Sequence, residues 1–433
     1  MTNIKTNNLA GDFWGGLAAM LVALPAAIAF GVTIFSVLGS SYAAYGALAG
    51  ILGATALGLV APLLGGTNRL ITAPCAPAAA VLSAFALELI QRGTPAEAIL
   101  LLLTVLGLSA GLLQVVFGLV GLGRLIKYMP YPLTSGYLSA VGLIFIASQL
   151  PKLLGTPIGT TLWQSLTTVS LWQWQGIVVG AVTAMVMLLA PRVTKLVPAA
   201  ILALLAGELT YFGLSLFDGN LLRLAGNTLV VGPLDTGAGN NDFIEGLLGR
   251  WHGVSQLSLS QIGNMLMPAF TLAILLSIDT LKTSVVVDTL TRTRHDSNRE
   301  LIGQGVGNMA SSLIGGLPGA GTMGATLVNM SSGAQTKRSG LFEGIFALAA
   351  LLVLGGVIAW VPVSALAAIL IVIGVRMIDR SSLELLKSRS TVLDFAVIAA
   401  VVCVALIFSL IAASATGVGL AILLFIREQI GGS

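Results

Sequence analysis

Long apolar stretches, separated by short groups of charged, Pro and Gly residues, follow one another along almost the whole chain. A helix that crosses about 30 Å of hydrocarbon needs about 20 apolar residues, and most of the stretches approach that length. We therefore expect fourteen membrane-spanning segments, of which the third and tenth are half-helices entered through short extended chain. The segments are expected near residues 13–38, 42–64, 72–90, 97–122, 130–150, 173–190, 196–216, 262–287, 300–315, 321–331, 340–360, 362–378, 393–411 and 414–427.

The composition agrees with a body that lies mostly in lipid. Charged residues make up 9% of the 433-residue chain and hydrophobic residues 56%, whereas about 25% of the residues of a soluble domain are charged. So few charges cannot cover a water-soluble body of this size. The net charge of +4 comes without any Lys/Arg run long enough to hold nucleic acid. The chain is predicted to be an all-α polytopic membrane protein that contacts lipid and not nucleic acid.

The basic residues are distributed unevenly between the two faces of this predicted topology. If the N-terminus lies in the cytoplasm, all Lys and Arg residues except five fall on the cytoplasmic side. Lys282 falls within a span, and four others fall on the external side. The exceptions, on the external side, are Arg92, Lys152, Arg223 and Arg250. Cytoplasmic loops carry an excess of Lys and Arg, so both termini are expected in the cytoplasm.

The two halves of the chain repeat the same features in the same order. A Gly pair at 65–66 and another at 315–316 each precede a short extended-looking segment. The fifth span opens with MPYPLTSGYLSAVGLIFI and the twelfth with VPVSALAAILIVIGVRMI, and Pro25 and Pro268 lie within the first and eighth spans. Seven spans followed by seven give the inverted repeat that is common in secondary transporters. The expected division is 1–12 cytoplasmic, 13–216 first repeat, 217–261 external loop, 262–427 second repeat and 428–433 cytoplasmic tail.

The Gly/Pro-interrupted segments at 67–77 and 317–326 are the best indication of a binding site, because they occupy matching positions in the two halves. Each leads into a helix, and helix N-termini offer free N–H groups and a partial positive charge to an anion. Small residues leave room there, and three threonine hydroxyls are candidate donors. The small residues are Ala73, Cys75, Ala76, Gly321 and Gly324, and the threonines are Thr72, Thr322 and Thr326. Ordinary kinks with small packing residues are the alternative interpretation.

Asp279 is the charged residue most in need of explanation, because a carboxylate inside a span is costly. Thr283 is one helical turn further on and shares its face. A carboxylate, a hydroxyl and carbonyls of unwound chain suit Na+, or a proton if the Asp titrates. A neutralising pair with Lys282, three residues on, is the alternative. No other cofactor is expected.

An enzyme is not expected. His252 and His295 are far apart in the sequence, no His–carboxylate pairing is apparent, and no Ser stands beside a base. Cys75 and Cys403 lie in apolar surroundings that do not indicate a disulfide or a metal cluster. The chemistry of the chain is therefore that of binding and transport.

Several motifs resemble those of the SulP anion transporters. Asn298, Glu300 and Leu301, followed by Gly303, Gly305 and Asn308, match the family's Asn-x-Glu-Leu segment. The stretch from Gly321 to Asn329 corresponds to its tenth-span motif, and SGAQTKRSG, which ends at Gly340, to its Gly-Ala-x-Thr-x-x-Ser-Gly. The ALPAAIAFG stretch of the first span and GTNRLITAPCAP of the third also align, so that the resemblance covers essentially the whole chain.

The resemblance implies fourteen segments in inverted repeats, with a core and a gate domain and an anion between the starts of the third and tenth helices. It places the anion at Thr72, Ala73, Cys75 and Ala76, opposite Gly321, Thr322, Met323 and Gly324, with Ala26 closing the site. Ile-Asp-x-Leu-x-Thr-Ser-Val-Val and Gly-Ala-Gly are similar to the cyanobacterial bicarbonate branch. That branch implies Na+ at Asp279, Thr283, Gly321 and Thr322.

Two departures from the family limit what is carried over. Many members have Gln where this chain has Ala26, and many animal members have Arg where it has Ala325, which argues against a site charged by arginine. Family members usually carry a cytosolic STAS domain, and since the chain ends six residues after Arg427, either the sequence is a shortened form or the member lacks that domain.

The expectation is a secondary transporter in a bacterial inner membrane that moves bicarbonate or sulfate, coupled to Na+, by elevator-like movement of core against gate. A homodimer is possible. Proton-coupled sulfate or dicarboxylate transport, anion exchange and a passive anion channel remain open alternatives. A nucleobase permease of the same fold is less favoured, because it would need polar side chains where this chain has Ala and Gly.

Overall fold

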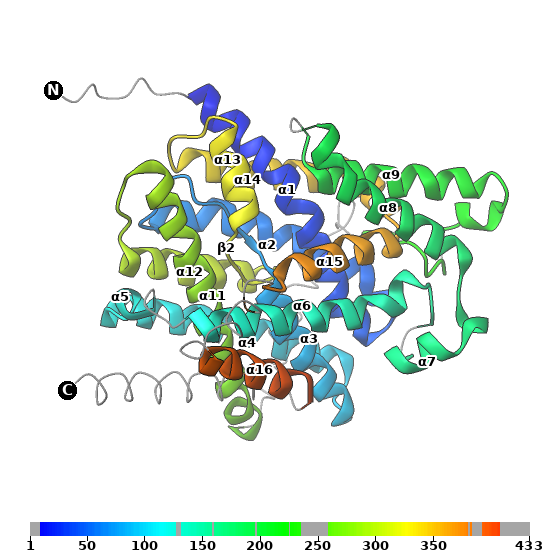
Figure 1. Cartoon of the computed structure of the whole chain (residues 1–433), viewed down its shortest axis with the longest axis horizontal. Helices are drawn as coiled ribbons and strands as arrows, with labels where there is room; N and C mark the ends of the chain where they lie inside the picture. The colour runs from blue at the N-terminus through cyan, green and yellow to red at the C-terminus, as the bar shows by residue number, and fades with distance from the viewer. Residues whose placement is uncertain are drawn as a thin grey trace.

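The computed structural model describes residues 9–126, 131–157, 160–194, 197–224, 226–234, 259–379, 382 and 392–407. Within them the chain is almost entirely helical (Figure 1). The α-helices are α1 (Leu9–Phe35), α2 (Ala43–Leu64), α3 (Ala76–Gln91), α4 (Ala96–Val120), α5 (Gly123–Ile126), α6 (Tyr131–Leu153), α7 (Leu162–Thr167), α8 (Trp174–Val193), α9 (Ala199–Ser215), α11 (Leu259–Thr291), α12 (Ser297–Leu313), α13 (Met323–Ser331), α14 (Arg338–Ile358), α15 (Val363–Met377) and α16 (Val392–Ile407). Short 3-10 turns, η1 (Ser36–Leu38), η2 (Ser40–Tyr42), η3 (Val169–Leu171) and η4 (Gly219–Leu222), join some of them.

Each span expected before residue 407 corresponds to a helix of similar extent. Among the described residues, 7 helices are long and apolar enough by length and composition to cross a membrane, and α3, α9, α15 and α16 are shorter apolar helices. Two expected features, the last span at 414–427 and the tail at 428–433, lie outside the described residues, together with 235–258 of the external loop.

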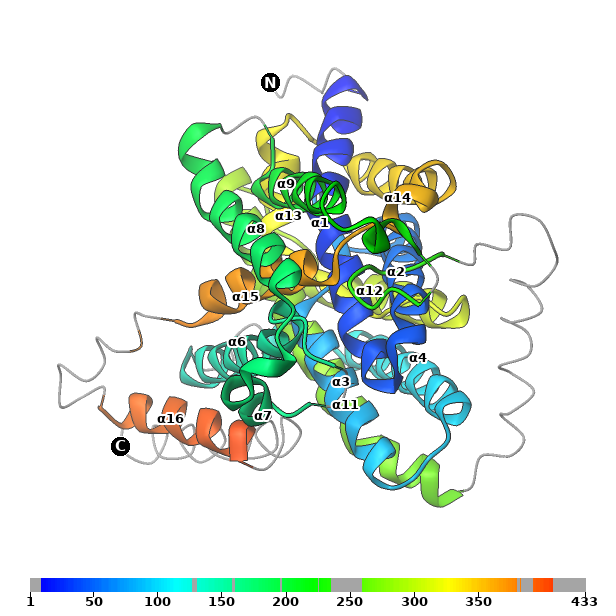
Figure 2. The same cartoon turned by 90° about the vertical axis from the view of Figure 1, so that its right-hand side faces the viewer.

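The helices pack in two groups, as the expected core and gate require. In the core domain, α12 packs on α4 and α2, and α1 packs on α2 and α14, with α3, α11 and α13 joining them. In the gate domain, α15 packs on α6 and α8, α8 on α9, and α16 on α6. Figure 2 shows α1 between α2 and α15, and α3 contacts α6, so these two core helices border the gate.

Glycine allows the core helices to approach until their backbones touch. A Cβ added at Gly31 of α1 would lie 1.8 Å from the carbonyl oxygen of Gly46 in α2, and one added at Gly46 would lie 2.3 Å from the carbonyl of Gly31. Because lipid provides no hydrophobic drive for association, helices in membranes gain stability from such close contact of small residues. This explains part of the high glycine content of the chain.

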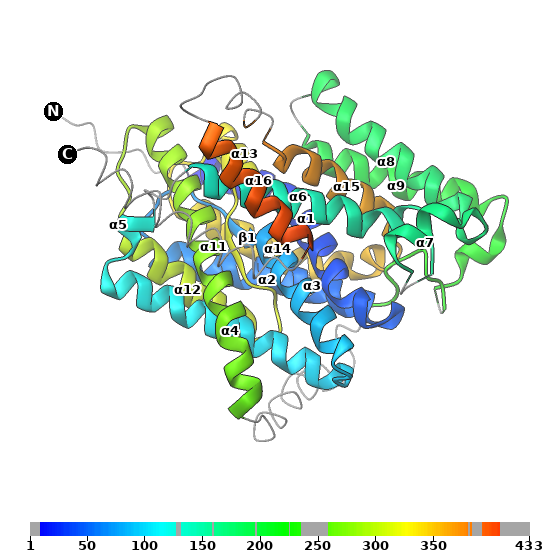
Figure 3. The same ribbon diagram turned by 60° about the horizontal axis from the view of Figure 1, so that its bottom comes forward.

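The two extended segments form one small sheet across the two halves of the chain. β1 (Thr72–Pro74) and β2 (Gly319–Gly321) pair antiparallel, with Ala73 opposite Ala320, and every residue of both strands is buried. Figure 3 shows β1 among the helices of the interior. Non-helical backbone is tolerated at membrane depth only where protein or a water-filled cavity satisfies it. Here the strands pair with each other, and side chains of α11 and α12 bind the remaining backbone groups of β2. The predicted short extended segments before spans three and ten are confirmed.

Candidate functional site

The strand pair determines where the two half-helices begin. Its register places Thr72 opposite Gly321 and Pro74 opposite Gly319. Because the strands are antiparallel, α3 begins beyond one end of the pair and α13 beyond the other. The starts of two helices from opposite halves of the chain are thereby held at the same small sheet.

Neither helix start is capped by a side chain. Cys75 and Thr322 occupy the N-cap positions of α3 and α13, and neither side chain accepts a capping hydrogen bond. Bonds along the helices begin with the amides of Ala79, to the Cys75 carbonyl, and of Thr326, to the Thr322 carbonyl, both at 3.1 Å. The preceding N–H groups have no helical partner, and each start carries about half a positive charge that favours an anion. At α3 only Ala76 and Ala78 supply such N–H groups, because Pro77 has none.

Open space lies on the α13 side of the strand pair. A Cβ added at Gly324 would meet no atom within 4 Å, and Gly324 is exposed. Met323 and Ala26 are half-buried, whereas Ala73, Cys75 and Ala76 on the α3 side are buried. A small ligand at this place would lie against α13 and have access to the start of α3 only past these small side chains.

The three expected threonine donors hold the strands together. The Thr322 hydroxyl donates to the Ile71 carbonyl at 3.4 Å, and the Thr326 hydroxyl accepts from the Ile71 amide at 3.0 Å. The Thr72 hydroxyl accepts from Gln304 Nε2 at 2.8 Å and is almost fully buried. These contacts assign the threonines to the scaffold of the site, and their part in anion binding stays a prediction.

Asp279 and Thr283 lie on α11 beside the strand pair. Asp279 is half-buried, and the buried Thr283 hydroxyl has no hydrogen-bond partner among the described residues. Thr280, which the sequence did not indicate, accepts from the Gly321 amide at 2.9 Å and so ties α11 to β2. Lys282 is exposed, and the described residues include no close ion pair between it and Asp279. A neutralising effect of Lys282 on Asp279 at longer range stays the alternative.

Most of the chain, including both strands and both helix starts, matches a family of known proteins. Residues 9–401 match the model of the sulfate permease family. The chain belongs to this family. The match spans all the described helices except the last residues of α16, and it confirms the expected relationship.

Two curated relatives are named as bicarbonate transporters. BicA of Picosynechococcus sp. is 34% identical over 390 residues, which cover 88% of this chain and 64% of the relative. BicA of Synechocystis sp. is 34% identical over 433 residues, 98% of this chain and 71% of the relative. A putative sulfate transporter of Bacillus subtilis, YvdB, is 27% identical over 335 residues, 76% of this chain and 60% of that protein. The chain spans about two thirds of the length of these relatives.

Solved structures share the fold. The transmembrane domain of a cyanobacterial BicA superposes with a TM-score of 0.77 at 34% identity, over 95% of this chain and 98% of that one. The murine anion transporter Slc26a9 in its inward-facing state superposes with a TM-score of 0.78 at 18% identity, over 98% of this chain and 70% of that one. This sulfate permease family member is therefore a multi-pass integral membrane protein with the predicted helical fold, and its relatives are transporters and not enzymes.

A buried polar network behind the strands was not predicted from the sequence. Asn308 of α12 donates to and accepts from the backbone of Gly319, at 3.0 and 2.7 Å, and donates to Gln114 of α4 at 2.7 Å. Gln304 donates to both Thr72 and Glu300. Residues 300, 304 and 308 are four apart and so share one face of α12. That spacing of polar residues was the available signal.

Glu300 joins this network to the cytoplasmic end of α2 in the predicted topology. Its carboxylate accepts the amides of Gly66 and Thr67 at 2.8 and 2.7 Å. Lys337 donates to the carbonyl of Gly65. Burial and the neighbouring Arg299 lower the pKa of Lys337, and Glu300 opposes them. The turn before β1 is therefore held from α12 and from the start of α14.

One expectation about catalytic groups is wrong. His295 pairs with Asp288, with Nδ1 and Oδ2 2.6 Å apart, and its Nε2 lies 2.9 Å from the hydroxyl of Ser297. The sequence did not suggest this pairing because the three residues come together only in the turn between α11 and α12. The His295 side chain is only 4% exposed, so the triad-like group stabilises the turn and gives a substrate no access.

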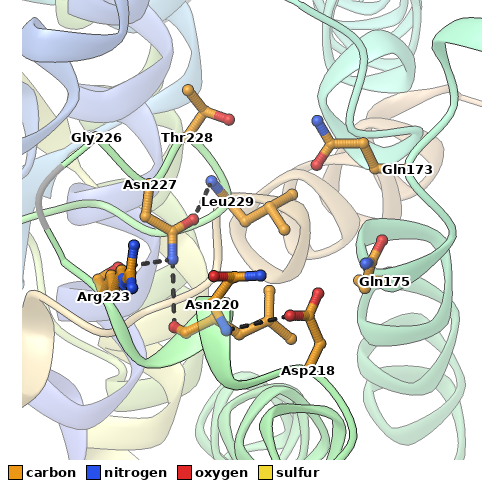
Figure 4. A pocket seen from close by; sticks show the side chains of 10 residues that line it. Gln173, Gln175, Asp218, Asn220, Arg223, Gly226, Asn227, Thr228 and Leu229 are labelled. Atoms are coloured by element: carbon orange, nitrogen blue, oxygen red, sulfur yellow. Dashed lines mark hydrogen bonds between the residues drawn. The ribbon is translucent and has the colours of Figure 1, made fainter.

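A separate polar pocket lies away from the strand pair (Figure 4). It has a volume of about 340 Å³ and lies between the start of α8 and the segment that follows α9. Its lining consists of Gln173, Gln175, Asp218, Asn220, Leu221, Arg223, Gly226, Asn227, Thr228 and Leu229. Asn227 donates to the Tyr211 hydroxyl and accepts from the Leu229 amide, so its amide serves the fold of this segment.

Proposed function

We propose that the chain is a secondary active transporter that moves a small oxyanion, bicarbonate or sulfate, together with Na+. The observation that carries the proposal is the meeting of two uncapped helix starts, those of α3 and α13, at one strand pair. Together they offer roughly one positive charge and several N–H donors. No Lys or Arg belongs to either helix start, which favours reversible binding over a tight ion pair.

Bicarbonate is the first candidate for the anion. Two helix starts compensate about one negative charge, which matches a monoanion better than sulfate. The relatives that are 34% identical are named as bicarbonate transporters, and a more distant relative as a putative sulfate transporter. Sulfate is therefore the second candidate.

Na+ is proposed to bind beside the anion, at Asp279 and Thr283 with backbone oxygens of Gly321 and Thr322. The fit rests on the Thr283 hydroxyl, which is buried and lacks a partner among the described residues. A buried hydroxyl without a partner costs free energy, and a cation held by this oxygen and the Asp279 carboxylate recovers it. No described group of three or more His, Cys, Asp or Glu is suited to a transition metal.

Movement of the core domain against the gate domain is the proposed transport step. The strand pair and the helix starts belong to the core, and α1 and α3 border α15 and α6 of the gate. The core can therefore carry the site past the gate without unfolding it. We also propose that the protein lies in a bacterial inner membrane with both termini in the cytoplasm. A homodimer is the proposed form of any assembly.

Uptake into proteoliposomes tests the proposal. Radiolabelled bicarbonate, at alkaline pH where little CO₂ is present, is expected to enter saturably and faster under an inward Na+ gradient. Asp279→Asn removes the charge that holds Na+ and is expected to abolish the Na+ dependence, while Asp218→Asn, in the polar pocket of the gate, serves as the control.

Other outcomes separate the alternatives. Sulfate or dicarboxylate uptake driven by a pH gradient would identify a proton-coupled transporter, and uptake that needs a counter-anion an exchanger. Non-saturating flux or single-channel currents would identify a channel. Anion uptake that Na+, pH gradients and Asp279→Asn all leave unchanged would refute cation coupling.

A further inference from the structure

Tyr137 of α6 is a buried side chain whose polar end has no partner. The residue is 4% exposed and packs in the same apolar cluster as Cys75 and Ala76. Its hydroxyl is buried and forms no hydrogen bond among the described residues. By contrast, the buried Tyr211 donates to the Leu221 carbonyl at 2.8 Å. A buried hydroxyl left unpaired costs free energy, so we expect the unpaired hydroxyl of Tyr137 to have a functional role.

Tyr137 packs with helices that carry the proposed anion and Na+ sites. Its cluster of buried residues includes Cys75 and Ala76 at the start of α3, and Leu276 and Leu281 of α11, on either side of Asp279. α3 contacts both α6 and α11. Tyr137 therefore reaches, from the gate domain, the place where the start of α3 and the Na+ site of α11 meet.

The gate holds this part of α6 firmly. Ser135 donates to the Asp379 carboxylate at 2.8 Å, and Ser139 accepts from the Asp379 amide at 3.1 Å. Serines four residues apart share one helix face, whereas Tyr137, two residues from each, points to the other side. The contacts with Asp379, beyond the end of α15, therefore orient Tyr137 toward the core.

We infer that the Tyr137 hydroxyl is an anion-binding group that the gate domain supplies, and that it hydrogen-bonds the oxyanion held at the starts of α3 and α13. The inference rests on the proposed function. A phenol donates a hydrogen bond without adding positive charge and accepts one from a protonated ligand. Such a group suits an oxyanion that carries a hydroxyl, such as bicarbonate, better than one that carries none, such as sulfate.

Tyr137→Phe tests the inference because it removes only the hydroxyl. We expect the KM for bicarbonate to rise about tenfold, the loss of one hydrogen bond to a charged ligand, with the Na+ dependence retained. The midpoint of thermal unfolding without anion should stay the same, while the stabilisation that added bicarbonate gives to the detergent-solubilised protein should shrink. Tyr42→Phe, in the turn between α1 and α2, is the matched control and is expected to behave as the wild type.

The possible failures can be told apart. A bicarbonate KM and a bicarbonate-induced stabilisation of Tyr137→Phe within twofold of the wild-type values would overturn the inference while leaving the proposed function intact. A wild-type protein that shows neither saturable bicarbonate uptake nor stabilisation by bicarbonate would instead overturn the proposed function. If Tyr137→Phe raises the KM for sulfate as much as the KM for bicarbonate, the hydroxyl does bind the anion, but the preference for a protonated anion is refuted.

Discussion

Asn308 holds β2 from behind, so replacing it tests whether the strand pair positions the start of α13. Its side chain donates to the Gly319 carbonyl at 3.0 Å, accepts from the Gly319 amide at 2.7 Å and donates to Gln114 Oε1 at 2.7 Å. Asn308 and Gln114 are both fully buried. Asn308→Ala removes all three bonds at once and leaves their partners in a place that bulk water does not reach.

The expected loss follows from these partners. A buried polar group that loses its partner costs about 1–3 kcal/mol, and the substitution affects the amide and carbonyl of Gly319 and the Gln114 oxygen. Even at the low end of that range the sum is about 3 kcal/mol. This is a large part of the stability of a typical protein, and it acts on the strand that leads into α13.

Thermal unfolding of the detergent-solubilised protein, with and without bicarbonate, provides the assay. Asn308→Ala is expected to lower the unfolding midpoint by several degrees and to reduce the stabilisation by bicarbonate, since the start of α13 loses its support. Asn264→Ala, at an exposed position of α11, is the matched control. If Asn308→Ala unfolds at the wild-type midpoint and binds bicarbonate with unchanged affinity, the strand pair does not position the site.

Two further substitutions address the strands and the cation. Gly319→Ala would place a Cβ 2.1 Å from the Ala73 carbonyl oxygen, so it is expected to separate the strands, cost about 1–3 kcal/mol of stability and lower the thermal unfolding midpoint. Gly356→Ala is the control, because its Cβ would meet nothing within 4 Å and the midpoint should stay unchanged or rise. Equal unfolding midpoints for the two variants would contradict the importance of the close strand contact. Thr283→Val keeps the shape of the side chain and removes the unpaired hydroxyl, so the Na+ concentration for half-maximal uptake should rise about tenfold with little change in stability. Thr289→Val, at an exposed position of α11, is the control. A Na+ requirement that stays unchanged in Thr283→Val would exclude the Thr283 oxygen as a Na+ ligand.

The positions of the spans could be predicted because they depend on local composition. A segment such as 42–64 contains too few polar groups to remain in water and enough residues to cross a bilayer, and α2 (Ala43–Leu64) follows it closely. The breaks before α3 and α13 were visible for the same reason, since Gly and Pro interrupt a helix wherever they cluster. The candidate site was therefore placed at two segments that the structure brings together as one strand pair.

The roles of individual side chains at that site could not be predicted in the same way. Thr72 and Thr322 were expected to face an anion, but their described contacts are with Gln304 and with Ile71. His295 was expected to have no carboxylate partner and has Asp288. Each of these contacts depends on where a turn or another helix places a second residue, which no local pattern contains.

The sequence by itself determined that this protein lies in a membrane, where its helices run, and where two Gly/Pro breaks interrupt them. Those properties follow from hydropathy, length and the conformations open to Gly and Pro, all of which act over a few residues. Only the tertiary structure decided that Thr72 pairs with Gly321, that α12 supports both strands, and that the hydroxyl of Tyr137 is buried without a partner among the described residues. The physical reason is that hydrogen bonds and close contacts between distant segments depend on how the helices pack against one another.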